Sequence, residues 1–144
     1  HEREREMMKE FFEEAESDEE KKEIRKEYNQ FGLEHHRNIK EEFLNALEED
    51  HDFLLGYFSG ADVIGHLNFG NTTLMKMIYD DLDEIAEKIK EIRDDHLLVL
   101  SDHGMEEVGR FGDHNEYGFW SFDEDCKLEN PKLTDFAEFL TNLD

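Results

Sequence analysis

The stretch LLVLSDHGM, residues 97–105, is the starting point for predicting the fold of this chain. Its four leading apolar residues, Leu97 to Leu100, are typical of a short β-strand that is buried on both faces, as in a parallel sheet. Asp102 and His103 follow directly, and open parallel sheets place their ligand sites beyond the carboxyl ends of the strands. Neighbouring side chains of a regular strand point to opposite faces, so these two can converge only after the strand has ended. The stretch therefore predicts a buried strand that leads into a candidate site.

A second strand-like segment, Asp52–Phe58, precedes another acid and histidine. Asp62 and His66 lie four residues apart, a spacing that suits either a helical turn or a loop that curls round an ion. Apolar residues at helical spacing between Leu74 and Ile92 then predict an amphipathic helix. A strand, a helix and a strand with short connections form a parallel βαβ unit. We therefore predict an α/β fold with a parallel-type sheet and flanking helices, in which both acid-and-histidine segments open at one edge.

The first fifty residues are heavily charged and predict helices. Ser17 to Glu20 match a capping box, which should start a helix that runs to about Tyr28. Residues 29–32 indicate a break before the next helix. His35 and His36 diverge by about 100° on a helix and make a poor chelating pair, so we expect surface histidines.

The segment beyond Met105 is rich in glycine and predicts a loop that contains His114. A further short strand is expected at residues 118–122, and Thr134 should cap a last helix. Taken singly, each acid or histidine is more commonly a cap, a turn former or a solvated side chain. Gathered at one sheet edge without a thiolate, they favour a Zn²⁺, Mn²⁺ or Fe²⁺ site over a structural zinc site. The candidate ligands are Asp62, His66, Asp102, His103 and His114.

Composition narrows the classes of function. The 144 residues suit one domain, and 40 acidic against 16 basic side chains give a formal net charge of −24. No basic footprint for nucleic acid is present, and an anionic membrane surface is an equally poor partner. This acidity also repels phosphate esters, so a phosphate site would need local cations, of which metal ions are the simplest.

Cysteine use and the absence of long apolar runs favour a cytoplasmic location. Cys126 is the single cysteine, which rules out an internal disulfide and fits a reducing compartment. No apolar run approaches the roughly 20 residues of a membrane span. The sequence also begins without Met, which predicts a piece of a longer chain.

Three motifs together resemble the alkaline phosphatase superfamily, specifically its type I phosphodiesterase/nucleotide pyrophosphatase branch. They are DVIGH at residues 62–66, SDHGM at 101–105 and GDH at 112–114, and the resemblance covers about residues 52–122. It implies two divalent metal ions, commonly zinc with manganese as an alternative, beside a Thr or Ser nucleophile that attacks phosphorus. The implied substrate is a small phosphate ester or nucleotide. By motif, Asp62, His66 and His114 would hold one ion, while Asp102 and His103 would belong to the other.

This chain also departs from the family pattern. The family places a further metal-binding Asp and the nucleophile before the first motif, where Ser17 and Ser59 are the only Ser or Thr residues in this sequence. We therefore expect residues 51–144 to be the C-terminal part of such a domain, preceded at residues 1–50 by a charged helical insertion or cap. The partner implied is the N-terminal half of the same enzyme, and the isolated chain should be inactive. The alternatives are phosphotransfer of the phosphoglycerate mutase kind and a non-catalytic acidic module that binds metal or a protein.

Overall fold

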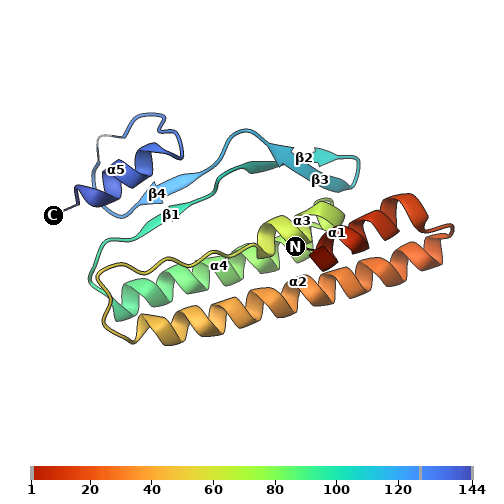
Figure 1. Ribbon diagram of the computed structural model, residues 1–144, viewed down its shortest axis with the longest axis horizontal. Coiled ribbons are helices and arrows are strands. Elements are labelled where there is room, and N and C mark those ends of the chain that lie inside the picture. The colour runs from red at the N-terminus through yellow and green to blue at the C-terminus, as the bar shows by residue number, and fades with distance from the viewer. Residues whose placement is uncertain (1, 127, 144) are drawn as a thin grey trace. The chain divides into compact units, whose positions relative to one another are not determined.

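The computed structural model describes residues 2–126 and 128–143 (Figure 1). They form two compact units. The first, which we call the helical unit, extends to Asp94 and includes Met105–Asp113; the C-terminal unit comprises Asp95–Gly104 and the residues from His114 onward. The elements in chain order are α1 (Glu2–Lys9), the π-helix η1 (Glu10–Glu14), α2 (Asp18–Leu47), α3 (Gly60–Asn68), α4 (Thr72–Ile92), β1 (Leu98–Leu100), β2 (Gly104–Val108), β3 (Phe111–Asn115), β4 (Trp120–Phe122) and α5 (Asp135–Thr141).

In the helical unit, α2 and α4 lie side by side, and α3 packs against both (Figure 1). The predicted amphipathic helix is confirmed as α4, whose N-cap Asn71 accepts a hydrogen bond from the Leu74 amide at 3.2 Å. Apolar side chains from several helices meet in two core clusters, because each helix presents one apolar face to the others. The buried members are Met7, Phe11, Tyr28, Val63 and Leu67 in one cluster and Ile64, Met75 and Ile78 in the other.

The long helix α2 confirms one prediction and corrects another. The capping box is present, since Ser17 Oγ accepts from the Glu20 amide at 3.2 Å and the Glu20 carboxylate accepts from the Ser17 amide. The predicted break at residues 29–32 is wrong, because the helix runs on to Leu47. Gly32 lies where α2 meets α3, and a Cβ there would come within 3.0 Å of Val63 Cγ1 and Ile64 Cδ1. Helix packing across this glycine outweighs its helix-propensity cost of about 1 kcal/mol.

The predicted strand at Asp52–Phe58 is wrong, since these residues form no regular secondary structure. Strand geometry requires a neighbouring chain to satisfy its backbone groups, and no other described segment pairs with this one. The alternating residues Phe53, Leu55 and Tyr57 are 62%, 76% and 63% exposed. Residues 60–68, which follow, form the helix α3, so of the two geometries that the spacing of Asp62 and His66 allows the structure has the helical turn.

The described sheets are small and antiparallel, so the parallel sheet predicted from the βαβ pattern is not present among these residues. In the C-terminal unit β1 pairs antiparallel with β4, with Leu98 opposite Phe122. The expectation that this strand is buried on both faces is wrong, because Val99 and Leu100 are 41% and 38% exposed. A strand with one neighbour and one packed face cannot bury both faces. Helices and strands are both present, in agreement with the predicted α/β class.

The C-terminal unit buries aromatic side chains between its strands and its helix. Trp120 of β4 packs edge-on against Phe136 of α5 at 5.7 Å between ring centroids, and Phe122 packs on Phe139 at 5.1 Å. The short strand expected at residues 118–122 and the last helix are therefore confirmed as β4 and α5. The expected cap is wrong, because Thr134 precedes α5 but its side chain makes no capping hydrogen bond.

The glycine-rich segment after Met105 is a hairpin rather than the predicted loop. Strands β2 and β3 form a two-stranded sheet, and the two residues between them force an antiparallel arrangement. Gly109 adopts φ +67° in the connection, a conformation that favours glycine. None of the helices described combines the length and the apolar character needed to cross a membrane. The predicted domain boundary near residue 50 stays a prediction.

A partly buried ion-pair cluster joins α2 to α4 and corrects the expectation that His36 lies on the surface. His36 is 5% exposed, and its Nε2 donates to Asp81 Oδ2 at 2.7 Å. Lys40 donates to the other oxygen of Asp81 and also pairs with Glu84 at 3.3 Å. Burial alone would raise the pKa of Asp81, but the hydrogen bonds from Lys40 and His36 outweigh it, so this pKa lies below its ordinary value of 3.8.

Replacing Asp81 by asparagine should therefore lower the free energy of unfolding at neutral pH by about 1–2 kcal/mol. A carboxylate whose pKa is lower in the folded state stabilises the fold above its unfolded pKa, and this contribution is lost as the pH falls through the folded pKa. The difference between wild type and variant should thus shrink below about pH 3.8. Urea unfolding at several pH values measures it. Asp80→Asn is the matched control, because Asp80 pairs only with the exposed Lys76 in the described structure and should change stability by less than about 0.5 kcal/mol.

Candidate active site

Helix α3 carries the first acid and histidine pair of the candidate site. Asp62 lies in the first turn and His66 in the last, so they are one helical turn apart on the same face. His66 Nε2 lies 3.4 Å from Asp62 Oδ1, and both side chains are partly buried, at 16% and 28% exposure. Two ligands held at about 2.0–2.1 Å in a tetrahedral zinc site are about 3.3–3.4 Å apart. The separation of these two atoms therefore fits two ligands of one ion.

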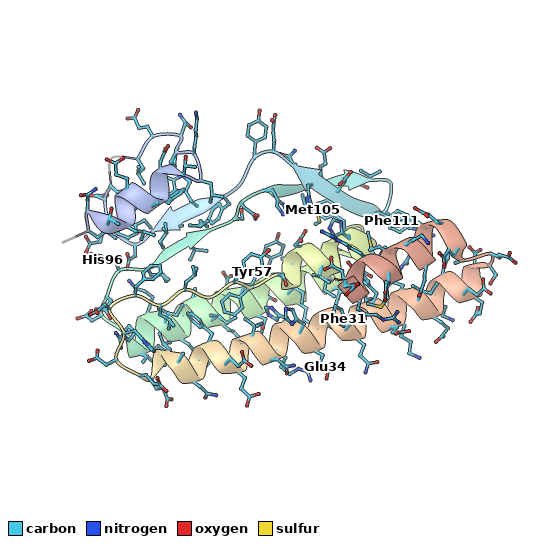
Figure 2. All side chains as sticks on the ribbon, viewed as in Figure 1. Phe31, Glu34, Tyr57, His96, Met105 and Phe111 are labelled. Atoms are coloured by element: carbon cyan, nitrogen blue, oxygen red, sulfur yellow. The ribbon has the colours of Figure 1, made fainter. Side chains whose placement is uncertain are left out.

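The hairpin fixes the orientation of the His66 ring. His66 Nδ1 lies 3.2 Å from the Gly112 carbonyl oxygen, which can only accept, so Nδ1 carries the proton. Nε2 then carries the lone pair on the side where Asp62 lies, as metal binding requires. Met105, labelled on β2 in Figure 2, packs its sulfur against Gly65 and Gly112. A Cβ at Gly112 would lie 2.8 Å from the Gly65 carbonyl oxygen, so only glycine allows this approach.

The second acid and histidine pair lies in the C-terminal unit, between β1 and β2. Both residues follow the end of the strand, as the sequence predicted. His103 Nε2 lies 3.7 Å from Asp102 Oδ1, and His103 Nδ1 donates to the Gly104 carbonyl oxygen at 3.0 Å. The His103 ring also stacks on His114, with 3.8 Å between ring centroids. The same tautomer argument directs the Nε2 lone pair of His103 towards Asp102.

The structure thus groups the predicted ligands within each unit. Asp62 and His66 lie together in the helical unit, and Asp102, His103 and His114 lie together in the C-terminal unit. His114 lies two residues after Gly112 on β3, and the Gly112 carbonyl oxygen accepts the hydrogen bond from His66. That Asp62, His66 and His114 share one ion stays a prediction.

Two features beside Asp62 and His66 are absent from the sequence-based prediction. Tyr28 is fully buried, and burial raises the pKa of its hydroxyl, with further contributions from the charges of Glu4 and Asp62. His36 packs against Gly60 at the start of α3, where a Cβ would come within 2.6 Å of His36 Nδ1. The only sequence signal for these two features is the helical spacing of Tyr28 and His36, which places both on one face of α2. Helical periodicity does not show which other helix that face contacts.

Comparisons with known proteins agree with these motifs. A family model described as type I phosphodiesterase / nucleotide pyrophosphatase matches residues 3–121. GPI ethanolamine phosphate transferase 2 of Debaryomyces hansenii is 34% identical over 79 residues, which are 53% of this chain and 9% of that protein. The enzyme of the same name from Yarrowia lipolytica is 33% identical over 91 residues, 60% of this chain and 11% of its own length. Both relatives belong to the alkaline phosphatase superfamily.

A third relative performs a different reaction by name. The 2,3-bisphosphoglycerate-independent phosphoglycerate mutase of Sulfurimonas denitrificans is 32% identical over 83 residues, 55% of this chain and 16% of that protein. The chain therefore spans between about a tenth and a sixth of the lengths of these relatives. No solved structure gives a significant match.

Proposed function

Because this chain belongs to the type I phosphodiesterase / nucleotide pyrophosphatase family, we propose that it forms part of a metal-dependent enzyme that hydrolyses phosphate esters. Family membership supports phosphoryl-transfer chemistry in general. The finer proposal is hydrolysis of a phosphodiester or of a nucleotide pyrophosphate. The observation that carries the proposal of a metal-dependent site is the 3.4 Å separation of His66 Nε2 and Asp62 Oδ1. The hydrogen bond from His66 Nδ1 to the Gly112 carbonyl supports it, because it directs the Nε2 lone pair towards Asp62.

The five candidate ligands divide between two ions in this proposal. Asp62, His66 and His114 would hold one ion, and Asp102 and His103 would contribute to the other. Divalent ions in such a site, commonly zinc with manganese as the alternative, neutralise charge on the phosphoryl oxygens and on an attacking hydroxyl. The chain's own contribution is to orient the ligands: the carbonyl oxygens of Gly112 and Gly104 each hold one imidazole with Nδ1 protonated.

The nucleophile in this proposal comes from a segment of the protein outside these 144 residues. Ser17 serves as a helix cap, and Ser59 is 7% exposed at the start of α3. The structural role of Ser17 and the burial of Ser59 support a nucleophile from elsewhere in the protein. The same outside segment would supply strands that pair with residues 52–58 and with β1, which completes the parallel sheet. The exposed apolar side chains of Phe53, Leu55 and Tyr57 support such pairing, because an unpaired segment of this kind invites strand addition. Residues 1–50 would then form an insertion that influences substrate choice.

The experiment compares the complete protein with this chain alone. The complete protein should hydrolyse a chromogenic phosphodiester when Zn²⁺ or Mn²⁺ is added, and the chain alone should not exceed the metal blank. In a metal titration the chain should bind at most about one ion tightly, since two protein ligands hold a divalent ion weakly. Clear turnover by the chain alone, abolished by Asp62→Asn, would place the nucleophile within these residues and overturn the proposal.

A second candidate function rests on the phosphoglycerate mutase relative. In that case the complete protein would interconvert 2- and 3-phosphoglycerate and leave the chromogenic phosphodiester intact. A non-catalytic module that binds metal or a protein is the third possibility, and it predicts metal binding without either activity.

A further inference from the structure

Positive charge is concentrated at one place in the helical unit, although the chain has 40 acidic and only 16 basic side chains. A pocket of about 330 Å³ there is lined by four cations, one acid and one aromatic ring: Lys21, Lys22, Arg25, Arg110, Asp18 and Phe11. An adjoining pocket of about 640 Å³ shares Lys22 and Arg25 and adds Lys26 and Arg37 to the cations. Arg25 therefore lies at the junction of two basic pockets.

Arg25 has no anionic partner among the described residues. Its guanidinium carbon lies 5.1 Å from the ring centroid of Phe11 and 5.7 Å from that of Phe111. Its Nε is buried without a hydrogen-bond partner, and no ion pair within residues 2–126 and 128–143 involves Lys21, Arg25 or Arg110. Burial lowers the pKa of Arg25, and the charge of Arg110 lowers it further. A buried donor without an acceptor is costly, and a like charge beside it adds to the cost.

The pocket is lined by residues of η1 and α2 and by Arg110, which lies in the turn between β2 and β3. The π-helix η1 places Phe11, which is 2% exposed, next to the half-exposed Phe12. Both rings pack edge-on against Phe111 of β3, which is labelled in Figure 2, at 5.6 and 5.2 Å between centroids. A π-helical turn is rare and is frequently found at functional sites. In this pocket it supplies a rigid aromatic wall on which the Arg25 guanidinium rests.

We propose that this basic pocket binds a phosphate-bearing anion, with Arg25 and Arg110 as its principal ligands. An oxyanion beside the two guanidinium groups offsets their repulsion and offers acceptors to their N–H groups. The planar guanidinium matches phosphate oxygens in a bidentate arrangement, and Lys21 and Lys22 add charge that favours a multiply charged anion over a monoanion. Asp18 opposes binding and Lys22 already pairs with Glu19 at 3.4 Å, so among the described residues the unpaired positive charge of the pocket comes from Lys21, Arg25 and Arg110.

This site is separate from the proposed metal ligands and goes beyond the proposed function. Arg110 and Phe111 directly precede Gly112, whose carbonyl holds His66. An anion bound at Arg110 would therefore also stabilise the hairpin that orients His66.

The test is calorimetric titration of the complete protein with inorganic phosphate and with pyrophosphate. A metal chelator is present throughout, so that phosphate does not bind through divalent ions. We expect saturable binding that is tighter for pyrophosphate. Arg25→Gln and Arg110→Gln should each weaken it by about 10-fold or more, the usual effect of losing a charge-assisted hydrogen bond. Lys88→Gln, an exposed cation of α4 outside both pockets, should bind as wild type does.

Two results would overturn this proposal. One is the absence of saturable binding of either anion by the wild type. The other is the same affinity in wild type, Arg25→Gln and Arg110→Gln. Arg25 packs against two phenylalanine rings, so its variant is checked for folding by circular dichroism. Arg110 is exposed, and its variant decides the outcome if Arg25→Gln is unfolded.

Discussion

Replacing His66 by alanine in the complete enzyme should lower kcat/KM for a phosphodiester by at least about 100-fold. Loss of a residue that merely orients a metal ligand costs about 10–100-fold in affinity or activity, and loss of the ligand itself should cost no less. The bound metal measured by elemental analysis should fall in parallel. His35→Ala is the matched control, since His35 is an exposed histidine whose ring stacks on Phe31, and it should leave both quantities unchanged.

The same variant separates a metal ligand from a structural residue. His66 donates a hydrogen bond to the Gly112 carbonyl, and its Nε2 lies 3.4 Å from Asp62 Oδ1 within its own helix. Its loss should therefore reduce the free energy of unfolding by only about 1 kcal/mol. Full turnover in His66→Ala, or a loss of stability that accounts for the loss of activity, would contradict its assignment as a ligand.

Elements with strong local signals could be predicted from the sequence. Helix α4 has apolar residues at helical spacing and an asparagine cap, and the start of α2 has a complete capping box. These signals depend on residues within one or two turns, so no distant partner is needed to interpret them.

Features that depend on distant partners could not be predicted. Residues 52–58 have the composition of a strand, but a strand forms only where another segment pairs with it. Gly32 indicates a break by propensity, yet packing of α2 on Val63 and Ile64 keeps the helix continuous. In both cases the tertiary contact, rather than the local preference, decides the structure.

The candidate site shows the same division. The spacing of Asp62 and His66 allowed a helical turn, and the structure has that turn with the two side chains in contact. The Gly112 carbonyl that sets the His66 tautomer lies 46 residues away along the chain, and no spacing rule indicates a backbone contact of this kind. The burial of His36 was missed for a similar reason, since its partner Asp81 is on another helix.

Replacing Ile64 by alanine should reduce the free energy of unfolding of the helical unit by about 2–5 kcal/mol. Ile64 is fully buried on α3, and it packs with Met75 and Ile78 of α4. Removing its outer carbons leaves a cavity, because close-packed surroundings relax only partly. Urea unfolding followed by circular dichroism measures the change. Leu100→Ala removes a similar apolar side chain that is 38% exposed, so its cost should stay below about 1.5 kcal/mol.

A double-mutant cycle tests whether Ile64 is in contact with α2. A Cβ at Gly32 would lie 3.0 Å from Ile64 Cδ1, closer than normal packing allows, so Gly32→Ala should destabilise the wild-type chain. In the Ile64→Ala background that atom is absent, and the added methyl group instead occupies part of the cavity. The second substitution should then cost less, or even stabilise, which gives a coupling energy of about 0.5–3 kcal/mol. Strictly additive effects of the two substitutions would show that Ile64 does not contact α2 at Gly32, where Val63 would then be the remaining contact.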